Sequence, residues 1–514
     1  MILTKTEESR LLDSMAMKEY GIPEMVLMEN AGASVVRLTE DKVEWDGAFT
    51  VVLCGTGNNG GDGFVTARYA AGAGARVLVL LMGNEAHMSE SSRMYRSIVE
   101  KMGIPVISIS RAEEGAPYIH DADILVDALI GTGLSREVTG EKAQLITIMN
   151  EAEGIIISVD VPSGMITDTG RAAGVVVDAD YTIALGSVKR GHVLYPGSSY
   201  SGTLLYSAIG IPDEARMDFP VHLTEQEDIF NILPVRNRIS HKGKNGFIGI
   251  FAGSDGMEGA ALLAGQGALY AGGGKIAVVT SAGASRLLAG KIPELMVSSL
   301  GEGSFFTGED SEKALKRAES YDVVALGPGL GRRKETGCFV RDMVMSWNKT
   351  MVIDADGLYA LKEENVDLKR CPGRLILTPH VGEFSHLTGL SPKEVEAGRI
   401  DEAIRYAVEN HVVLVLKGAP TVTAMPDGSA WVNPTGNPGM ASGGMGDTLT
   451  GIIAALAGQG MNASGAALAG VYLHGLAGDL AAEKTPVGYR ASDLAALVPL
   501  ARAEVMEETG DGMK

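Results

Sequence analysis

TVVLCGTGNNGGDG, residues 50–63, joins an apolar run to a glycine-rich loop, and the helix-forming stretch FVTARYAAGAGA follows it. Strand, glycine loop and helix is the order of a dinucleotide-binding turn, and the glycines satisfy the G-x-G-x-x-G spacing. A dehydrogenase of that kind also needs an acid about 20 residues further on to hold the ribose. The next apolar run is RVLVLLM (76–82), and the nearest acid after it, Glu85, comes too late. The stretch therefore predicts an α/β domain and disfavours a redox enzyme.

The same loop is unusually polar for a bare phosphate cradle. Asn58, Asn59 and Asp62 add amide and carboxylate groups among the glycines. A tight turn without a ligand would explain the glycines, because glycine readily adopts the backbone angles of such turns. It would not explain the three polar side chains together. We therefore expect this loop to bind a polar ligand.

The composition limits the class of protein. The chain has 514 residues and a formal net charge of −20. This length exceeds one ordinary core, so two or three domains are expected. The acidic balance disfavours a nucleic-acid or anionic-membrane partner, because phosphate contacts need clustered Lys and Arg. Three widely spaced cysteines predict free thiols in a reducing compartment. The sequence lacks both an apolar signal core and a run of about 18 apolar residues, which predicts a cytoplasmic protein.

From residue 49 onward, short apolar runs alternate with helical stretches, which is typical of a mostly parallel sheet covered on both faces. We predict a first αβα domain over residues 1–212 and a second over 236–514. The segment 213–235 between them has mixed charge and is predicted to be a linker. In the second domain, TVTAMPDGSAWVN (421–433) is typical of a hairpin, and the last part of the chain is predicted to be helical.

Polar side chains follow several predicted strands of the first domain. In open α/β sheets, ligands bind beyond the carboxyl ends of the strands. There the sequence places Asn59, Asp127 and Ser163 as oxygen donors, with Asp160 beside them. Oxygen ligands with one or two carboxylates suit a monovalent cation or Mg²⁺. Each group also has a structural explanation as a turn residue, but their occurrence at three strand ends favours a site.

Two further features belong to the same edge. Gly131 and Gly133 offer backbone N–H groups to a phosphate. Lys189, in SVKRGH after the strand YTIAL, is a candidate for proton transfer. A solvated surface lysine is an equally simple interpretation of Lys189, because most lysines are exposed.

The most informative stretch of the second half is NPTGNPGMASGGMGDTLTG, residues 433–451. Its glycine-dense loop runs straight into an apolar helix, whose first backbone N–H groups form an anion site. Asp447 lies at the helix start. A carboxylate there either caps the helix or takes the proton of a hydroxyl that attacks a phosphoryl group. Capping alone needs no such glycine density, so we predict Asp447 as a catalytic base.

Other loops of the second half follow predicted strands. KGAPT (417–421) brings Lys417 and backbone amides to a nucleotide, and LGPGLG (326–331) adds a glycine turn. LTPHVGEF supplies His380, for which a half-buried structural histidine is the alternative. The G-x-x-x-x-G-K-[ST] pattern does not occur in the sequence, so a P-loop enzyme is excluded.

With these motifs the chain resembles a known family. Gly444, Met445, Gly446 and Asp447 resemble the G-x-G-D anion hole of the ribokinase-like superfamily. Together HKGKNG, LTPHVGEF, KGAPT and GNPGMASGGMGD resemble the NAD(P)H-hydrate dehydratase family. In the first half, NNGGDG, IGTGLSRE and DVPSG resemble the NAD(P)H-hydrate epimerase family. The order of the two halves resembles the bifunctional NAD(P)H-hydrate repair enzymes over nearly the whole chain.

The resemblance implies a Rossmann-like first domain, a ribokinase-like second domain and repair of damaged coenzymes. NADH and NADPH that take up water across a ring double bond give R and S hydrates. The first half would interconvert the two hydrates. The second half would dehydrate the S form to NAD(P)H with ADP, giving AMP and phosphate. K⁺ is implied in the epimerase site and Mg²⁺ in the dehydratase, and a homo-oligomer acting on small molecules is expected.

The resemblance also assigns residues, with Asp160 and Lys189 as proton-transfer candidates of the epimerase. It implies K⁺ ligands, namely Asn59, Asp127 and Ser163. It implies an epimerase hydrate site of Asn58, Asn59, Gly60, Gly61, Asp62, Gly131, Thr132, Gly133, Leu134, Ser135, Arg136, Glu137 and Asp160. It implies a dehydratase hydrate site of Ala260, Gly329, His380 and Asp447. It implies a nucleotide site of Lys417, Gly418, Ala419, Pro420, Thr421 and Gly446.

Two other classes stay open at this point. A small-molecule kinase of the ribokinase class would release a stable phosphorylated product without loss of water. Alternatively, the first half would be a non-catalytic binding or dimerisation module, as in RNA-decay scaffold proteins of similar fold. Such a module has no need of Asn59, Asp127, Asp160 and Ser163, which are all present.

Overall fold

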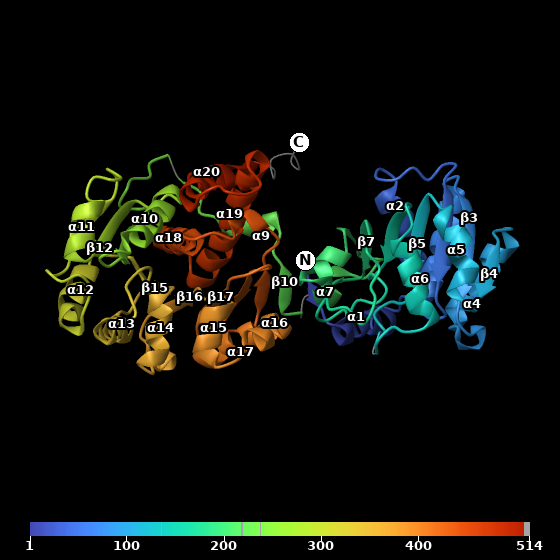
Figure 1. Ribbon diagram of the computed structural model, residues 1–514, viewed down its shortest axis with the longest axis horizontal. Helices are drawn as coiled ribbons and strands as arrows, with labels where there is room; N and C mark the ends of the chain where they lie inside the picture. The colour runs from blue at the N-terminus through green and yellow to red at the C-terminus, as the bar shows by residue number, and fades with distance from the viewer. Residues whose placement is uncertain (135, 217–218, 237, 508–514) are drawn as a thin grey trace. The chain divides into compact units, whose positions relative to one another are not determined.

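The computed structural model describes residues 1–134, 136–216, 219–236 and 238–507 (Figure 1). The chain divides into two compact units, Met1–His222 and Leu223–Lys514. Each unit is a parallel or mostly parallel sheet with helices on both faces, which confirms the predicted class of two αβα domains. Among the helices that the structure describes, none is both long and apolar enough to cross a membrane.

The first unit is built on a seven-stranded sheet of order β4-β3-β2-β5-β6-β7-β9, in which every neighbouring pair is parallel. Its strands are β2 (Phe49–Cys54), β3 (Arg76–Met82), β4 (Val106–Ile109), β5 (Ile124–Ala128), β6 (Ile155–Val159), β7 (Tyr181–Leu185) and β9 (Thr203–Ser207). A separate short pair joins β1 (Leu3–Thr4) to β8 (Val188–Lys189) in parallel.

This sheet is buried on both faces because successive residues of a strand point to opposite sides. Val52 of β2 packs in one core cluster with the helices α1–α4, and Val51 packs in the other with α5 and α6. The helices are α1 (Thr6–Lys18), α2 (Glu24–Thr39), α3 (Asn58–Gly72), α4 (Glu90–Lys101), α5 (Ala112–His120), α6 (Glu141–Asn150), α7 (Arg190–Val193) and α8 (Gly197–Tyr200).

The second unit is built on a ten-stranded sheet of order β10-β19-β18-β17-β16-β15-β14-β11-β12-β13. Strands β11 to β17 are parallel, and β17, β18 and β19 are antiparallel, which confirms the predicted hairpin. The strands are β10 (Val221–Leu223), β11 (Phe247–Phe251), β12 (Lys275–Thr280), β13 (Met296–Ser299), β14 (Val323–Leu326), β15 (Thr350–Ile353), β16 (Arg374–Leu377), β17 (Val413–Leu416), β18 (Val422–Ala424) and β19 (Ala430–Val432).

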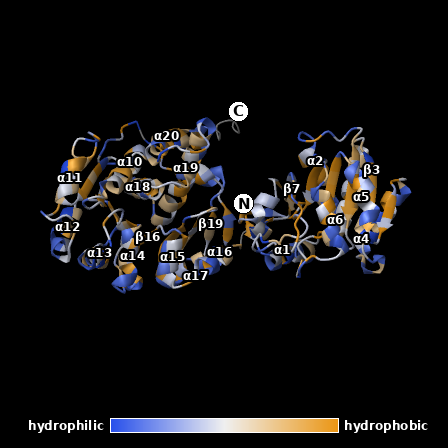
Figure 2. Cartoon of the chain, viewed as in Figure 1, coloured by the Kyte–Doolittle hydropathy of each residue, from blue (hydrophilic) through white to orange (hydrophobic). Residues whose placement is uncertain are grey.

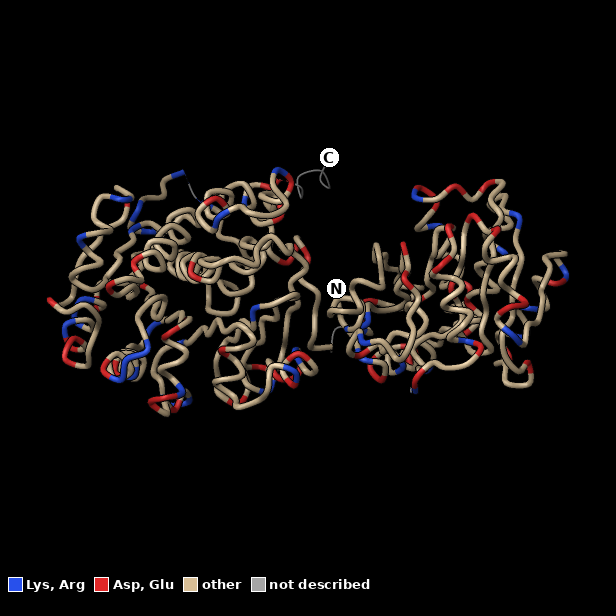
Figure 3. Tube along the Cα trace, viewed as in Figure 1, with Lys and Arg blue, Asp and Glu red and all other residues tan. Residues whose placement is uncertain are grey.

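Helices cover both faces of the second sheet (Figure 1). Ile250 of β11 joins a core with Leu449 and Leu456, whereas its neighbour Phe251 packs against Phe339 with ring centroids 6.2 Å apart. One face carries α10 (Glu258–Tyr270), α18 (Met445–Gly458), α19 (Ala463–Lys484) and α20 (Ala491–Glu507). The other carries α12 (Ser311–Ala318), α13 (Lys334–Ser346), α14 (Asp356–Glu363), α15 (Val381–Thr388), α16 (Pro392–Ala397) and α17 (Arg399–Asn410). Apolar strands lie inside these layers (Figure 2), and acidic and basic residues mix over the outer helices (Figure 3).

The structure corrects the prediction of a plain linker over residues 213–235. Strand β10 lies at the edge of the second sheet, and the helix α9 (Gln226–Ile232) follows it. Ile229 and Leu233 are buried in the core of the second unit. The second unit therefore begins inside this segment, because the apolar residues of the segment belong to the core of that unit. The charged residues around them led to the prediction of a linker.

Candidate functional sites

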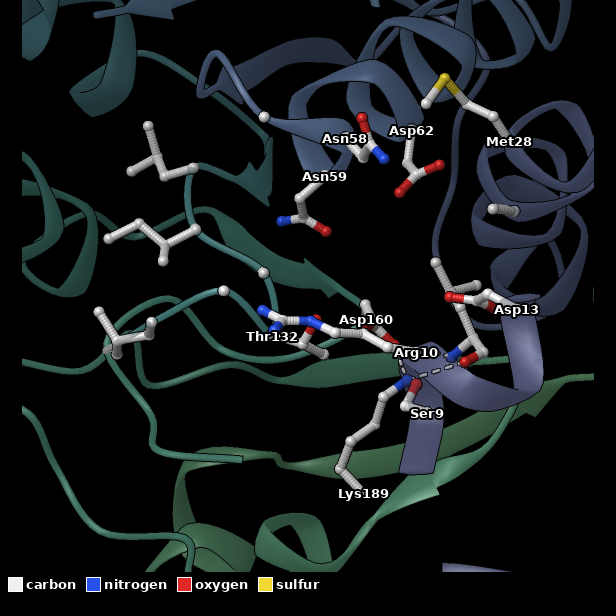
Figure 4. Close-up of a pocket in the computed structure, with 18 of the residues that line it drawn as sticks. Ser9, Arg10, Asp13, Met28, Asn58, Asn59, Asp62, Thr132, Asp160 and Lys189 are labelled. Atoms are coloured by element: carbon white, nitrogen blue, oxygen red, sulfur yellow. Dashed lines mark hydrogen bonds and ion pairs between the residues drawn. The ribbon is translucent and has the colours of Figure 1, made fainter. Parts of the chain in front are cut away.

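A cavity of about 1080 Å³ opens at the carboxyl ends of the strands of the first sheet (Figure 4). Strand order changes direction between β2 and β5, which is where open α/β sheets bind ligands. Most of the hydrate-binding residues predicted for the first half meet in its lining: Asn58, Asn59, Asp62, Gly131, Thr132, Gly133, Leu134, Arg136, Glu137 and Asp160, with Lys189. Ser135 lies outside the described residues.

Gly60 and Gly61 do not line this cavity and have a packing role instead. A β-carbon at Gly60 would lie 1.9 Å from the carbonyl oxygen of Gly55, and one at Gly61 would lie 2.6 Å from the sulfur of Met28. The start of α3 can therefore approach the loop after β2 and the helix α2 only because these two side chains are absent. This close approach fixes where Asn59 and Asp62 enter the cavity.

Asp160 and Lys189 form a buried ion pair at one end of the cavity. Lys189 Nζ donates to Asp160 Oδ1, and also to the carbonyl oxygens of Leu185 at 2.8 Å and Ser187 at 3.1 Å. The Lys189 side chain is 1% exposed, so the interpretation of a surface lysine is wrong. Asp160 has a φ of 66°, a conformation that residues other than glycine rarely adopt and that is concentrated at functional sites. The pair is therefore buried and hydrogen-bonded, and both residues line the cavity.

Oxygen atoms of Asp127 and Ser163 converge below the loop after β5. Ser163 Oγ lies 2.5 Å from Asp127 Oδ1 and 3.2 Å from the carbonyl oxygen of Ile130, and Ser158 Oγ donates to Asp127 Oδ2 at 2.9 Å. Burial raises the pKa of Asp127, although the donors from Ser163 and Ser158 lower it. Such a buried carboxylate gains from a cation, because a nearby positive charge favours its ionised form.

Asn59, the third predicted cation ligand, lies across from this group. Its amide reaches Gly131, where a β-carbon would lie 3.0 Å from the Asn59 Cβ. The Asn59 Nδ2 atom is buried, and no hydrogen-bond partner for it occurs in the described part of the chain. In the same part of the chain, no three His, Cys, Asp or Glu side chains gather as a metal cluster. The donor set of amide, hydroxyl, carbonyl and one carboxylate fits a hard cation of low charge.

The N-terminal helix α1 supplies residues that sequence patterns do not indicate. Ser9, Arg10 and Asp13 of α1, with Glu24 of α2, line the cavity opposite the strand-end loops (Figure 4). Burial raises the pKa of Asp13, Lys189 lowers it, and the charges of Asp160 and Glu24 also raise it, so that the pKa lies at about 6. Helix α1 has no glycine motif and does not follow a strand of the main sheet, so its position at the site follows only from the fold.

In the second unit, Asp447 lies in the first turn of α18, directly after the glycine-rich loop. Gly444 precedes the helix with a φ of 92°, in the left-handed region that favours glycine. Backbone N–H groups at such a helix start have no partner within the helix and attract an anion. Burial and the negative charge of Asp354 raise the pKa of Asp447 to about 6, although the positive charge of Lys417 lowers it. A carboxyl group that titrates near neutrality suits proton transfer.

Lys417 is held directly beside this helix start. Its Nζ lies 2.8 Å from Asp354 Oδ1, and Thr450 Oγ1 donates to Asp354 Oδ2 at 2.8 Å. Burial alone would raise the pKa of Asp354, but Lys417 holds it below its ordinary value. A β-carbon at Gly446 would lie 3.0 Å from Lys417 Nζ, so the glycine keeps this cation close to the backbone that carries Asp447.

The predicted nucleotide loop, 417–421, is shaped by Arg399 of α17. The Arg399 guanidinium is buried and donates to the carbonyl oxygens of Lys417 at 3.3 Å and Pro420 at 3.2 Å. A β-carbon at Gly418 would lie 2.5 Å from Arg399 Nη1, so glycine is required there. The loop is therefore pre-organised by an arginine that the sequence pattern does not indicate.

Besides Asp447, the predicted hydrate-binding residues of the second unit lie in two groups at the same sheet edge. His380 begins α15, where its Nδ1 accepts two backbone N–H groups at 3.0 and 3.2 Å, and its backbone bridges to Lys417. Its side chain is 59% exposed, so the alternative of a half-buried histidine is wrong. Ala260 and Gly329 form the other group, since a β-carbon at Gly329 would lie 3.0 Å from Ala260 Cβ.

These features define a class of protein: an αβα unit with a polar cavity at the carboxyl ends of its strands, followed by an αβα unit with a glycine-rich loop at a helix start. The model of the family NAD(P)H-hydrate dehydratase matches residues 248–500, and the model of the YjeF-related protein N-terminus matches residues 24–191. A solved ribokinase-like superfamily protein from Enterococcus faecalis is 24% identical, covers 56% of this chain and 96% of its own, and gives a TM-score of 0.50. This likeness supports the fold of the second unit.

Full-length relatives are similar over both units. The bifunctional NAD(P)H-hydrate repair enzyme Nnr of Thermofilum pendens is 41% identical over 491 residues, which is 94% of this chain and 93% of that protein. The enzyme of the same name from Moorella thermoacetica is 39% identical over 521 residues, 99% of this chain and 98% of that one. The chain belongs to the family of bifunctional NAD(P)H-hydrate repair enzymes, and the resemblance noted from its motifs is confirmed.

Proposed function

We propose that this chain restores NADH and NADPH from their hydrates at two separate sites. The first unit interconverts the R and S hydrates, and the second dehydrates the S hydrate with ADP, giving NAD(P)H, AMP and phosphate. The observation that carries the proposal is Asp447 at the glycine-rich start of α18, with its pKa raised to about 6 and Lys417 beside it. Family membership supports the pairing of the two activities.

In the second unit, Asp447 takes the proton of the ring hydroxyl as that oxygen attacks the terminal phosphate of ADP. The backbone N–H groups at the start of α18 stabilise the charge that develops on the transferred phosphoryl group. Phosphate is a far better leaving group than hydroxide, so the ring nitrogen expels it and the double bond returns. His380, Ala260 and Gly329 are proposed to hold the hydrate at the same edge.

The adenine nucleotide is proposed to lie on Gly446 and the loop 417–421, with the charge of Lys417 directed toward its phosphates. Mg²⁺ would arrive with ADP and neutralise phosphate charge, because protein-bound Mg²⁺ usually combines one or two carboxylates with substrate phosphates. Glu383, whose Oε2 lies 3.9 Å from Lys417 Nζ, is a carboxylate that fits this role.

In the first unit, Asp160 is proposed to transfer a proton at the hydrate ring, and Lys189 to hold Asp160 in place through their ion pair. The remaining lining residues, including Asn58, Asp62 and the loop 131–137, would bind the dinucleotide. K⁺ would be held by Asn59, Asp127 and Ser163 and would supply a fixed positive charge beneath the loop after β5. That charge would favour the ionised form of Asp127, and the ligands would fix the loop that faces the substrate.

A recovery assay tests the proposal. The full chain is given a mixture of R and S hydrates of NADH with ADP, Mg²⁺ and K⁺, and the return of reduced-nicotinamide absorbance is followed. We expect full recovery, with a second phase that Asp160→Ala slows to the rate of spontaneous epimerisation. Absence of recovery with either ADP or ATP would contradict repair. A stable phosphorylated product without loss of water would favour the alternative of a small-molecule kinase.

A further inference from the structure

We propose that Asp13, on the N-terminal helix α1, is a further catalytic residue of the first site and gives a proton to the ring nitrogen of the hydrate while Asp160 takes one from its hydroxyl. This inference rests on the proposed epimerase function and deepens it. The family model of the first half begins at residue 24, so α1 lies outside the stretch by which the first half is matched.

The position of Asp13 is built into the site. Asp13 lines the same cavity as Asp160, Lys189 and Asp62, and Figure 4 shows Asp13, Asp160 and Lys189 around one end of it. Asp160 is engaged by Lys189 Nζ and by the Leu185 N–H at 3.0 Å. In contrast, no hydrogen bond or ion pair to the Asp13 carboxyl occurs within the described residues, so this carboxyl group remains available to a ligand.

The helix that carries Asp13 is fixed to the elements of the Asp160–Lys189 pair. Thr4, just before α1, pairs in register with Lys189 through the β1–β8 ladder. Thr6, at the start of α1, donates its N–H to Asp168 at 2.7 Å. Glu8 of α1 pairs with Arg190, the neighbour of Lys189, at 3.3 Å. These contacts place α1 relative to the pair independently of any substrate, as a catalytic group requires.

The carboxyl groups of Asp160 and Asp13 have different charged neighbours. Asp160 lies against the ammonium of Lys189 at the end of the cavity, where its second carboxyl oxygen can accept a proton from a ligand. Burial raises the pKa of Asp13 to about 6, helped by the charges of Asp160 and Glu24 and opposed by Lys189. Asp62 is a further carboxyl that faces Asp13, and its pKa is also raised by burial. A carboxyl group whose pKa is raised toward neutrality suits a proton donor.

The reaction needs both groups, because the carbon that inverts carries the hydroxyl and is bonded to the ring nitrogen. On opening, the hydroxyl proton goes to Asp160, the bond from this carbon to the ring nitrogen breaks, and the carbon–oxygen bond becomes a carbonyl. Asp13 gives its proton to the nitrogen that leaves. On closing, the nitrogen attacks the other face of the carbonyl, Asp13 takes back its proton, and Asp160 returns the other to oxygen. No proton or electron is gained or lost overall.

The test compares Asp13→Asn with Glu7→Gln in the full chain. Glu7 is an exposed carboxylate of the same helix and does not line the cavity. Supplied with the R hydrate, ADP, Mg²⁺ and K⁺, Asp13→Asn is expected to lose epimerisation by about 10²-fold or more, with KM little changed. Glu7→Gln should keep the wild-type rate. Dehydration of the S hydrate in both variants is the internal control and should be unchanged.

A pH profile separates a catalytic role from a structural one. Because Asp13 acts in its protonated form, epimerisation by the wild type should fall as pH rises through about 6, and Asp13→Asn should lack this limb. Asp13→Asn should also keep the melting temperature, since its burial already disfavours the charged form. Epimerisation by Asp13→Asn equal to that of Glu7→Gln, or an unchanged pH limb in Asp13→Asn, would overturn the inference. Absence of epimerisation in the wild type would instead contradict the proposed function.

Discussion

Each unit has a lysine–aspartate ion pair at the carboxyl edge of its sheet. The pair is Lys189–Asp160 in the first unit and Lys417–Asp354 in the second. In each, a lysine pairs with an aspartate that directly follows a parallel strand; the side chain of Lys189 is 1% exposed and that of Lys417 is 18% exposed. In each, burial also raises the pKa of another carboxyl nearby to about 6, namely Asp13 and Asp447. The comparison teaches that a buried ion pair does not by itself define the catalytic group. In the second unit the pair supports a separate carboxyl group, Asp447, whereas in the first unit the paired Asp160 is itself proposed to transfer a proton together with Asp13.

The two units differ in how they supply that carboxyl group. Asp447 follows a glycine-rich loop at a helix start, where backbone N–H groups are ready for a phosphoryl group. Asp13 lies in the third turn of a helix that has no such loop, and it faces a cavity rather than an anion hole. The second unit is therefore suited to proton removal coupled to phosphoryl transfer, and the first to proton exchange alone.

The largest effect should come from removing Asp447. Asp447→Asn keeps the size of the side chain but cannot accept the hydroxyl proton, so dehydration of the S hydrate should fall by about 10²-fold to 10⁴-fold. Epimerisation in the same variant, measured by loss of optically pure R hydrate, should be unaffected. If Asp447→Asn slowed both dehydration and epimerisation, the conclusion that the two sites act independently would be contradicted.

Breaking the supporting pair should weaken the second unit itself. Asp354→Asn removes the nearest counter-ion of Lys417 and leaves it only Glu383, at 3.9 Å. This should lower the free energy of unfolding by about 3 kcal/mol, the lower end of the cost of breaking a buried pair. The matched variant Thr450→Val removes one neutral donor to Asp354 and should cost about 1 kcal/mol. Hydrogen exchange of the amides of β15 and β17 reports the stability of this unit within the full chain. Equal stability of the two variants would contradict the role given to the ion pair.

The cation should matter to the first unit alone. Ser163→Ala removes one proposed K⁺ ligand and should raise the K⁺ concentration for half-maximal epimerisation by about tenfold or more. Ser158→Ala also removes a hydroxyl donor to Asp127, at 2.9 Å, but not a proposed ligand, so its K⁺ dependence should match the wild type. Identical K⁺ titrations for both variants and the wild type would remove Ser163 from the site.

A smaller effect follows from the opposite protonation states of the two carboxyl groups. Asp447 must be ionised to act, so dehydration should rise with pH through about 6, whereas epimerisation needs protonated Asp13 and should fall. Each limb changes the rate by at most about tenfold per pH unit. The rate of dehydration of the S hydrate and the rate of epimerisation of the R hydrate would each be measured against pH. If both rates changed in the same direction through a pH of about 6, the assignment of acid and base would be contradicted.

The sequence predicts the parts of both sites that follow strands. Loops after β2, β5 and β6 could be predicted to meet because parallel strands end at one edge, and Asp447 stands out by its glycine context. Asp354 also directly follows a strand, so the same rule would have found it. Asp13 and Arg399 could not be found in this way, because their helices reach the sites only through tertiary packing. The burial of Ile229 in the core also depends on tertiary packing, so the mixed charge of its segment did not predict it.

The most direct test of two separate repair sites is complementation between two inactive chains. Asp447→Asn and Asp160→Asn are each given pure R hydrate with ADP, Mg²⁺ and K⁺, alone and mixed, and the initial rate of NADH recovery is compared with the spontaneous rate. Neither variant alone should exceed the spontaneous rate. The mixture should recover NADH at a rate close to that of the wild type, because one chain epimerises and the other dehydrates. A mixture that stays at the spontaneous rate would contradict the account.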